Sequence, residues 1–195
     1  MKANDIFLLM LKAAEGTVRG KTLAHKRGYF LDKILDVGLN YKPHYYGPYS
    51  PKLEAAIGQC KALGFVEQKT ANYGFDMRKG FELKRYDYSL TEDGKTIVEN
   101  IMQKEPEKSA EIVELFKKIA EHDRDDYVKL SLAAKTMFVL EKQGGKMSYE
   151  EIIQEAKRYD WDISDTAVDK AAEFLSSIDL LEGTENEKEE GIGKG

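Results

Sequence analysis

The stretch "NYKPHYYGPYSPKLEAAIGQCKALGFVEQ", residues 40–68, decides the fold because it joins an aromatic turn to an amphipathic helix. Ser50 is a typical N-cap residue, and Pro51 suits the first helical position, where its missing N–H costs nothing. Gly64 is a typical stop after the last turn. Between these residues an apolar stripe recurs at helical spacing, made of Leu53, Ala56, Ile57 and Cys60. The spacing predicts a helix over 51–63.

The residues before and after this stretch predict further helices and two strands. Upstream, the apolar spacing predicts helices over 4–16 and 21–37. Downstream of Gly64 the hydrophobic period changes from about 3.6 to 2, which predicts strands over 65–69 and 81–90. Thr91 then begins a further helix. Three helices, a hairpin and a helix form a winged helix-turn-helix domain, which we expect over residues 1–104.

The second half reads as helical. Pro106, in a charged segment, predicts a boundary or bend. Four helices are expected beyond it, over about 109–122, 125–143, 148–159 and 164–178.

A repeated pattern suggests what this second half is. Residues 168–182 repeat the apolar pattern of residues 53–67. We therefore interpret residues 105–183 as a C-terminal helical domain with a degenerate helix-turn-helix unit. Residues 184–195 are acidic and glycine-rich, which predicts a disordered tail. The expected fold class is mostly α with a small β-hairpin.

Composition excludes several classes of protein. The single cysteine among 195 residues rules out a disulfide framework, so we expect a reducing compartment, the cytoplasm. No apolar run approaches the roughly 18 residues that span a bilayer, and the N-terminal segment reads as an amphipathic helix rather than a signal peptide. We expect no contact with a membrane.

Chemistry for catalysis is also missing from the sequence. Neither a P-loop nor a dinucleotide-binding glycine motif is present. His25, His44 and His122 stand apart without metal-ligand spacing, and Cys60 falls on an apolar stripe. Because no nucleophile can be matched with a base, we expect no enzyme, no cofactor and no metal.

Charge is distributed unevenly along the chain. The net charge is -5, but residues 1–104 hold 17 Lys and Arg against 12 Asp and Glu, whereas residues 105–195 hold 13 against 23. A basic half attracts polyanions and an acidic half repels them. The sequence therefore predicts that any nucleic acid binds the first half.

The sequence favours a transcriptional regulator that binds double-stranded DNA. Nine residues of the basic half are candidate DNA contacts. Cations at the start of the second helix are expected to anchor phosphates, the third helix to enter a groove, and the hairpin to touch the backbone. The phosphate anchors are Arg19, Lys21, Lys26 and Arg27; the groove contacts are Lys52 and Gln59; the hairpin contacts are Lys79, Lys84 and Arg85. A solvated helix face and a protected strand edge are the plainer alternatives.

The aromatic turn suggests a different function. Tyr45, Tyr46 and Tyr49 flank the Gly47-Pro48 turn, and we expect about half of these rings to be buried and half presented. Presented aromatic rings are typical anchors of protein interfaces. The alternative is therefore an antitoxin-like protein-interaction module without nucleic-acid binding. A homodimer through residues 109–143 is one arrangement that the sequence permits.

A family resemblance rests on these motifs. "HYYGPYSPKLEAAIGQCKALGFVE" and "YDYSLTEDGKTI" resemble the YGPYS and Y-x-LTE-x-G signatures of the YwgA-like proteins and, more distantly, the Panacea (SocA-like) antitoxin-associated domain. "GKTLAHKRGYFLDKIL" is similar to their second helix, and "MSYEEIIQEAKRYDWDIS" to the YwgA-like C-terminal part. The resemblance covers about residues 5–102 and implies a winged-helix fold among mostly uncharacterised proteins. Arg27 and Gly28 depart from its apolar pattern, which predicts that this helix face is turned outward.

Overall fold

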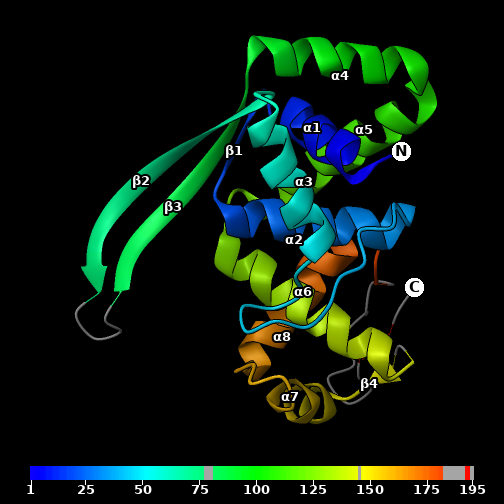
Figure 1. Ribbon diagram of the computed structural model, residues 1–195. Helices are drawn as coiled ribbons and strands as arrows, with labels where there is room; N and C mark the ends of the chain where they lie inside the picture. Colours follow the sequence, from blue (N-terminus) through cyan, green and yellow to red (C-terminus); the bar gives the residue numbers. More distant parts are fainter. Residues whose placement is uncertain (77–80, 145, 182–191, 194–195) are drawn as a thin grey trace.

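The computed structural model describes residues 1–76, 81–144, 146–181 and 192–193, and this part of the chain is mostly helical (Figure 1). The expected mostly-α class is therefore confirmed. The helices are α1 (Ala3–Ala13), α2 (Lys21–Leu35), α3 (Pro51–Ala62), α4 (Glu92–Lys104), α5 (Pro106–Asp123), α6 (Tyr127–Lys142), α7 (Tyr149–Lys157) and α8 (Asp165–Ser177). The strands are β1 (Thr17–Arg19), β2 (Val66–Asp76), β3 (Phe81–Leu90), β4 (Lys146–Met147) and β5 (Ile192–Gly193). Of the described helices, none is long and apolar enough to span a membrane.

The larger sheet has the antiparallel order β1-β3-β2, and its hairpin extends away from the helices (Figure 1). β1 pairs only with the end of β3 that returns to the body, where Arg19 lies opposite Asp87. The sequence prediction missed β1, because three residues with only Val18 buried show no measurable period. It also ended β2 too early, at Lys69 rather than Asp76.

Local capping explains where several helices begin. Ser50 Oγ accepts from the Leu53 N–H at 2.9 Å, and Thr91 Oγ1 accepts from the Gly94 N–H at 3.0 Å. Ser148 and Glu151 form the predicted capping box. Gly94 is required for packing, because a Cβ there would lie 2.1 Å from the Phe65 carbonyl oxygen.

One hydrophobic core joins the two halves of the chain. α2 packs against α5 and α6, α1 packs against α3 and α5, and α6 packs against α8 (Figure 1). The rings of Phe30 and Phe174 meet edge to face at 5.2 Å. The boundary or bend expected at Pro106 is a sharp bend, with α4 ending at Lys104 and Pro106 beginning α5. The core continues across this bend.

The helix face expected to turn outward at Arg27 and Gly28 is in fact buried. Only 3% of Arg27 is exposed. A Cβ at Gly28 would lie 2.7 Å from Tyr41 Oη and 3.1 Å from Leu53 Cδ2. Glycine therefore allows α2 to approach the α2–α3 loop closely, and the prediction of an outward face is wrong.

The second half repeats the element order of the first. α1-β1-α2-α3-β2 is a helix, a short strand, two helices and a strand, and α6-β4-α7-α8-β5 has the same order. β4 pairs antiparallel with β5, which lies within the segment predicted to be a disordered tail; residues 184–191 and 194–195 of that segment lie outside the described residues. The repeated apolar pattern in the sequence falls on α3 and α8, the corresponding helices of the two units.

Candidate anion-binding cleft

Two hollows beside the base of the hairpin meet at Arg19 and Asp125, which line both. One, of about 850 Å³, lies between the end of α1, β1 and α5. The other, of about 680 Å³, lies between the start of α2, β3 and the start of α6. We call the two hollows together the cationic cleft. Its cationic lining residues are Arg19, Lys21, Arg27, Lys84, Arg85, Lys117 and Arg124, and its acidic ones are Glu15, Glu121 and Asp125.

Backbone geometry brings these side chains together. Gly20, at φ 108°, turns the chain from β1 into α2, and a Cβ added there would lie 3.6 Å from Cγ of Arg85. Pairing of β1 with β3 therefore places the hairpin cations beside the start of α2. Arg124 and Asp125 both have positive φ, 52° and 60°, and make the tight turn between α5 and α6.

Arg27 forms the floor of the cleft but is largely committed to carboxylates. Its Nε and Nη2 donate to Asp123 at 2.8 and 2.7 Å, and Nη2 also donates to Asp125 at 2.6 Å. Burial disfavours the charged form, but the two carboxylates outweigh it and raise the pKa of the guanidinium. Arg27 is therefore not the free phosphate anchor that the sequence predicted. Two of its three guanidinium nitrogens, Nε and Nη2, make these bonds.

Lys21 and Arg85 also line the cleft, and each forms an ion pair with a nearby carboxylate. Lys21 Nζ lies 2.7 Å from Glu54 Oε1, and Arg85 Nε lies 2.8 Å from Asp87 Oδ1. Hydrogen bonds from His25 and Lys21 outweigh desolvation and lower the pKa of Glu54 to about 2. Both pairs are part-exposed, and such pairs contribute only about 0–1 kcal/mol, so a phosphate can compete for either cation.

Three cations of the cleft are better placed to meet an anion. Arg19, Lys117 and Arg124 are exposed, and the described part of the chain gives none of them an ion-pair partner. Lys84 is exposed and lines the same cleft. Sequence reasoning missed Lys117 and Arg124 because they belong to the acidic half, whose average charge concealed them. The turn that places Arg124 at the cleft has no sequence signature beyond the three aspartates around it, at positions 123, 125 and 126.

Lys26 is not a phosphate anchor. It is 3% exposed, and its ammonium donates to the Pro48 carbonyl oxygen at 2.7 Å. Desolvation and the charge of Lys135 lower the pKa of Lys26 to about 7. The side chain supports the α2–α3 loop and takes no part in the cleft, so this prediction is wrong.

The remaining predicted contacts lie elsewhere. Lys52 and Gln59 are exposed on α3 and do not line the cleft, and Lys52 Nζ donates to the Gly38 carbonyl oxygen at 2.7 Å. Lys79 lies outside the described residues. Of the nine predicted residues, the cleft brings together Arg19, Lys21, Arg27, Lys84 and Arg85.

The tyrosines of the α2–α3 loop form a second surface feature, the tyrosine loop, residues 44–49. Tyr45 and Tyr46 are 67% and 62% exposed, whereas Tyr49 is half-buried and stacks on His25 at 4.5 Å. Trp161 Nε1 donates to the His44 carbonyl oxygen at 2.8 Å. The loop therefore presents two rings on a backbone held by the second half of the chain.

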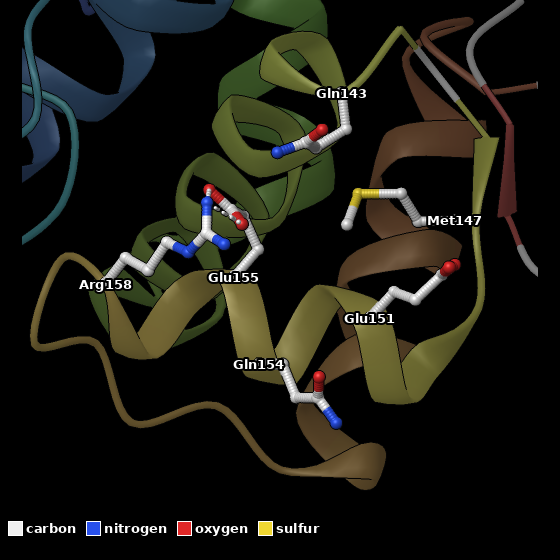
Figure 2. A pocket seen from close by; sticks show the side chains of 6 residues that line it. All are labelled: Gln143, Met147, Glu151, Gln154, Glu155 and Arg158. Atoms are coloured by element: carbon white, nitrogen blue, oxygen red, sulfur yellow. Dashed lines mark hydrogen bonds and ion pairs between the residues drawn. The ribbon is translucent and has the colours of Figure 1, made fainter.

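A third hollow, of about 470 Å³, lies between the end of α6 and α7 (Figure 2). Its charged groups already have local roles. Arg158 pairs with Glu155 at 3.0 Å, and Glu151 accepts from the Ser148 N–H at 2.8 Å. Its lining mixes one cation with two carboxylates, so it lacks the excess of cations that the cationic cleft has.

Neither a metal site nor a comparison with known proteins assigns a function to the chain. Within the described ranges, His, Cys, Asp and Glu side chains do not gather in groups that could hold a metal ion. No model of a known protein family matches the chain, and a comparison with curated proteins finds no match.

Proposed function

We propose that the chain is a winged-helix protein, similar to the YwgA-like proteins, that binds nucleic acid through the cationic cleft. The element order α1-β1-α2-α3-β2-β3 and the sheet order β1-β3-β2 support the winged-helix part of the proposal. The motifs around the tyrosine loop support the family part.

The observation that carries nucleic-acid binding is the convergence of cations from β1, α2, β3 and the end of α5 on one cleft. Arg19, Lys117 and Arg124 supply charge that carboxylates of the described residues do not neutralise. Phosphate contacts from such side chains account for most sequence-independent binding of nucleic acid and make it sensitive to salt.

The third helix gives less support to sequence-specific regulation. Lys52 and Lys61 donate to the Gly38 carbonyl oxygen and to Gln68, and Ala55 and Gly58 cannot read a base edge through polar side-chain groups. Gln59 is the remaining base-reading side chain on the exposed part of α3. The expected duplex-binding transcriptional regulator is therefore one form of the proposal, and it is tested by including a duplex.

The test compares two triple variants of equal charge. Arg19→Gln, Lys117→Gln and Arg124→Gln remove the three uncommitted cations, and Lys108→Gln, Lys157→Gln and Lys170→Gln remove three exposed lysines that lie outside the cleft. Fluorescence anisotropy with labelled DNA, both duplex and single-stranded, gives the affinities. We expect at least a tenfold loss for the cleft variant and less than a threefold loss for the control. Equal losses, or no binding by the wild type at two ionic strengths, would refute the proposal.

A protein-interaction module is the second candidate, favoured by the exposure of Tyr45 and Tyr46. Aromatic side chains on a held backbone lose little entropy on binding and are enriched among interface hot spots. The variant Tyr45→Ser with Tyr46→Ser removes both rings without touching Tyr49. Cross-linking in the host cell, followed by identification of the linked protein, separates the functions. This candidate predicts one partner that the variant loses while binding of DNA is unchanged.

A further inference from the structure

We infer that the cationic cleft receives a single strand of nucleic acid, with phosphates on its cations and an unpaired base against Tyr127. The inference deepens the proposed function and rests on it. It concerns the class of nucleic acid, which the cations alone do not determine.

Aromatic and apolar side chains share the smaller hollow with the cations. Leu23, Tyr86 and Tyr127 line it together with Arg19 and Lys84. Tyr127 is 60% exposed, so its ring is largely free to meet a ligand. The backbone that carries this ring is held in place, because the side chain of Asp126 caps the start of α6. It accepts from the N–H groups of Val128 and Lys129, each at 3.0 Å.

A cation beside an open aromatic ring suits an unpaired strand. Grooves that bind single strands combine charges that follow the backbone with rings on which bases stack. In a duplex the base faces are stacked inside the helix, so an aromatic side chain can reach them only after a base is extruded. Tyr127 would therefore contribute to single-strand binding and contribute little to duplex binding.

The size and continuity of the cleft leave room for such a strand. The hollow with Tyr127 has a volume of about 680 Å³, within the roughly 300–1,000 Å³ typical of sites that enclose a small ligand. Arg19 and Asp125 line this hollow and its neighbour of about 850 Å³, where Lys117 and Arg124 lie. A strand can thus place a base in the first hollow while its backbone passes Arg19 into the second.

Base stacking and phosphate contacts predict that the cleft binds strands of different nucleotide sequence with similar affinity. Stacking accepts every base, because each has an aromatic face, and phosphate contacts do not distinguish bases. The cleft residues invoked here are cations and a tyrosine, so we expect less than a tenfold difference in affinity between oligothymidine and a mixed-sequence strand.

The experiment measures four proteins against two probes: wild type, Tyr127→Ala, Tyr127→Phe, and Tyr45→Ala as a matched change at an exposed tyrosine away from the cleft. The probes are a fluorescein-labelled strand of about 12 nucleotides and the duplex of the same sequence, within the range of site sizes for such grooves. Circular dichroism confirms that each variant is folded.

We expect the strand to bind wild type at least tenfold more tightly than the duplex. Tyr127→Ala should weaken strand binding roughly tenfold and leave duplex binding within twofold, since the lost base stacking concerns the strand alone. Tyr127→Phe should restore strand binding, and Tyr45→Ala should change neither. Equal or tighter binding of the duplex, or an equal loss on both probes, overturns this inference and leaves the proposed function standing. Binding of neither probe refutes both.

Discussion

Two neighbouring cations on α2 occupy regions with opposite electrostatics. Lys26 and Arg27 are each 3% exposed. Arg27 lies at the floor of the cationic cleft, where Asp123 and Asp125 hold it charged, whereas Lys26 lies beneath the tyrosine loop with a carbonyl oxygen and the nearby Lys135. A buried cation either gains a carboxylate partner or becomes easier to deprotonate, and α2 shows both outcomes one residue apart.

The largest effect is expected at the cleft floor. Arg27→Met should lower the free energy of unfolding by about 3–5 kcal/mol, because it leaves Asp123, 1% exposed, without its counter-charge. Urea denaturation measures this loss. Arg85→Met is the control, since the Arg85 pair with Asp87 is part-exposed and should cost less than about 1 kcal/mol. A similar cost for both variants would mean that burial does not distinguish these ion pairs.

A smaller effect is expected beneath the tyrosine loop, and it depends on pH. The pKa of Lys26 is about 7 in the folded chain and 10.5 ordinarily, so between these values the unfolded chain binds more protons. Stability should therefore rise with pH in this window. From pH 7 to pH 9 the wild type should gain about 2 kcal/mol relative to Lys26→Met, measured by urea denaturation at both pH values. A constant difference between the two proteins would show that the ammonium is not desolvated.

The smallest effect concerns Glu54, which joins the two regions by bonding Lys21 in the cleft and His25 behind Tyr49. Its pKa is lowered from 4.5 to about 2, so its stabilising contribution is complete above pH 4.5 and is lost as pH falls toward 2. Because the side chain is 37% exposed, solvent screening limits this to about 1 kcal/mol. Acid titration of wild type and Glu54→Gln should show a steeper loss for wild type below pH 4.5. Parallel curves would contradict the assignment.

Local signals in the sequence were enough to predict most helices. N-caps such as Ser50 and Thr91, and the Ser148–Glu151 box, act within one turn, and the sequence shows them directly. β1 was missed because its partner, β3, lies about 70 residues away, and pairing rather than propensity makes it a strand.

The cleft could be predicted only in part, for a similar reason. The spacing of charges identified Arg19 and Lys84, but the carboxylate that neutralises Arg27 is 96 residues away along the chain. Whether a cation binds a ligand or stabilises the fold depends on such distant partners, which a single sequence does not show. Lys117 lines the cleft but was not predicted, because it belongs to the half of the chain with a net negative charge.

The central claim is that Arg19, Lys117 and Arg124 act together on a polyanion. The most direct measurement is the dependence of the binding constant for a single-stranded oligonucleotide on salt concentration. Each phosphate contact on a single strand contributes a slope of about 0.7 in log–log form, so removing all three cations should reduce the slope by about 2. Replacing Lys108, Lys157 and Lys170 with glutamine should leave it unchanged. Equal slopes for wild type and the Arg19, Lys117 and Arg124 variant would contradict the account.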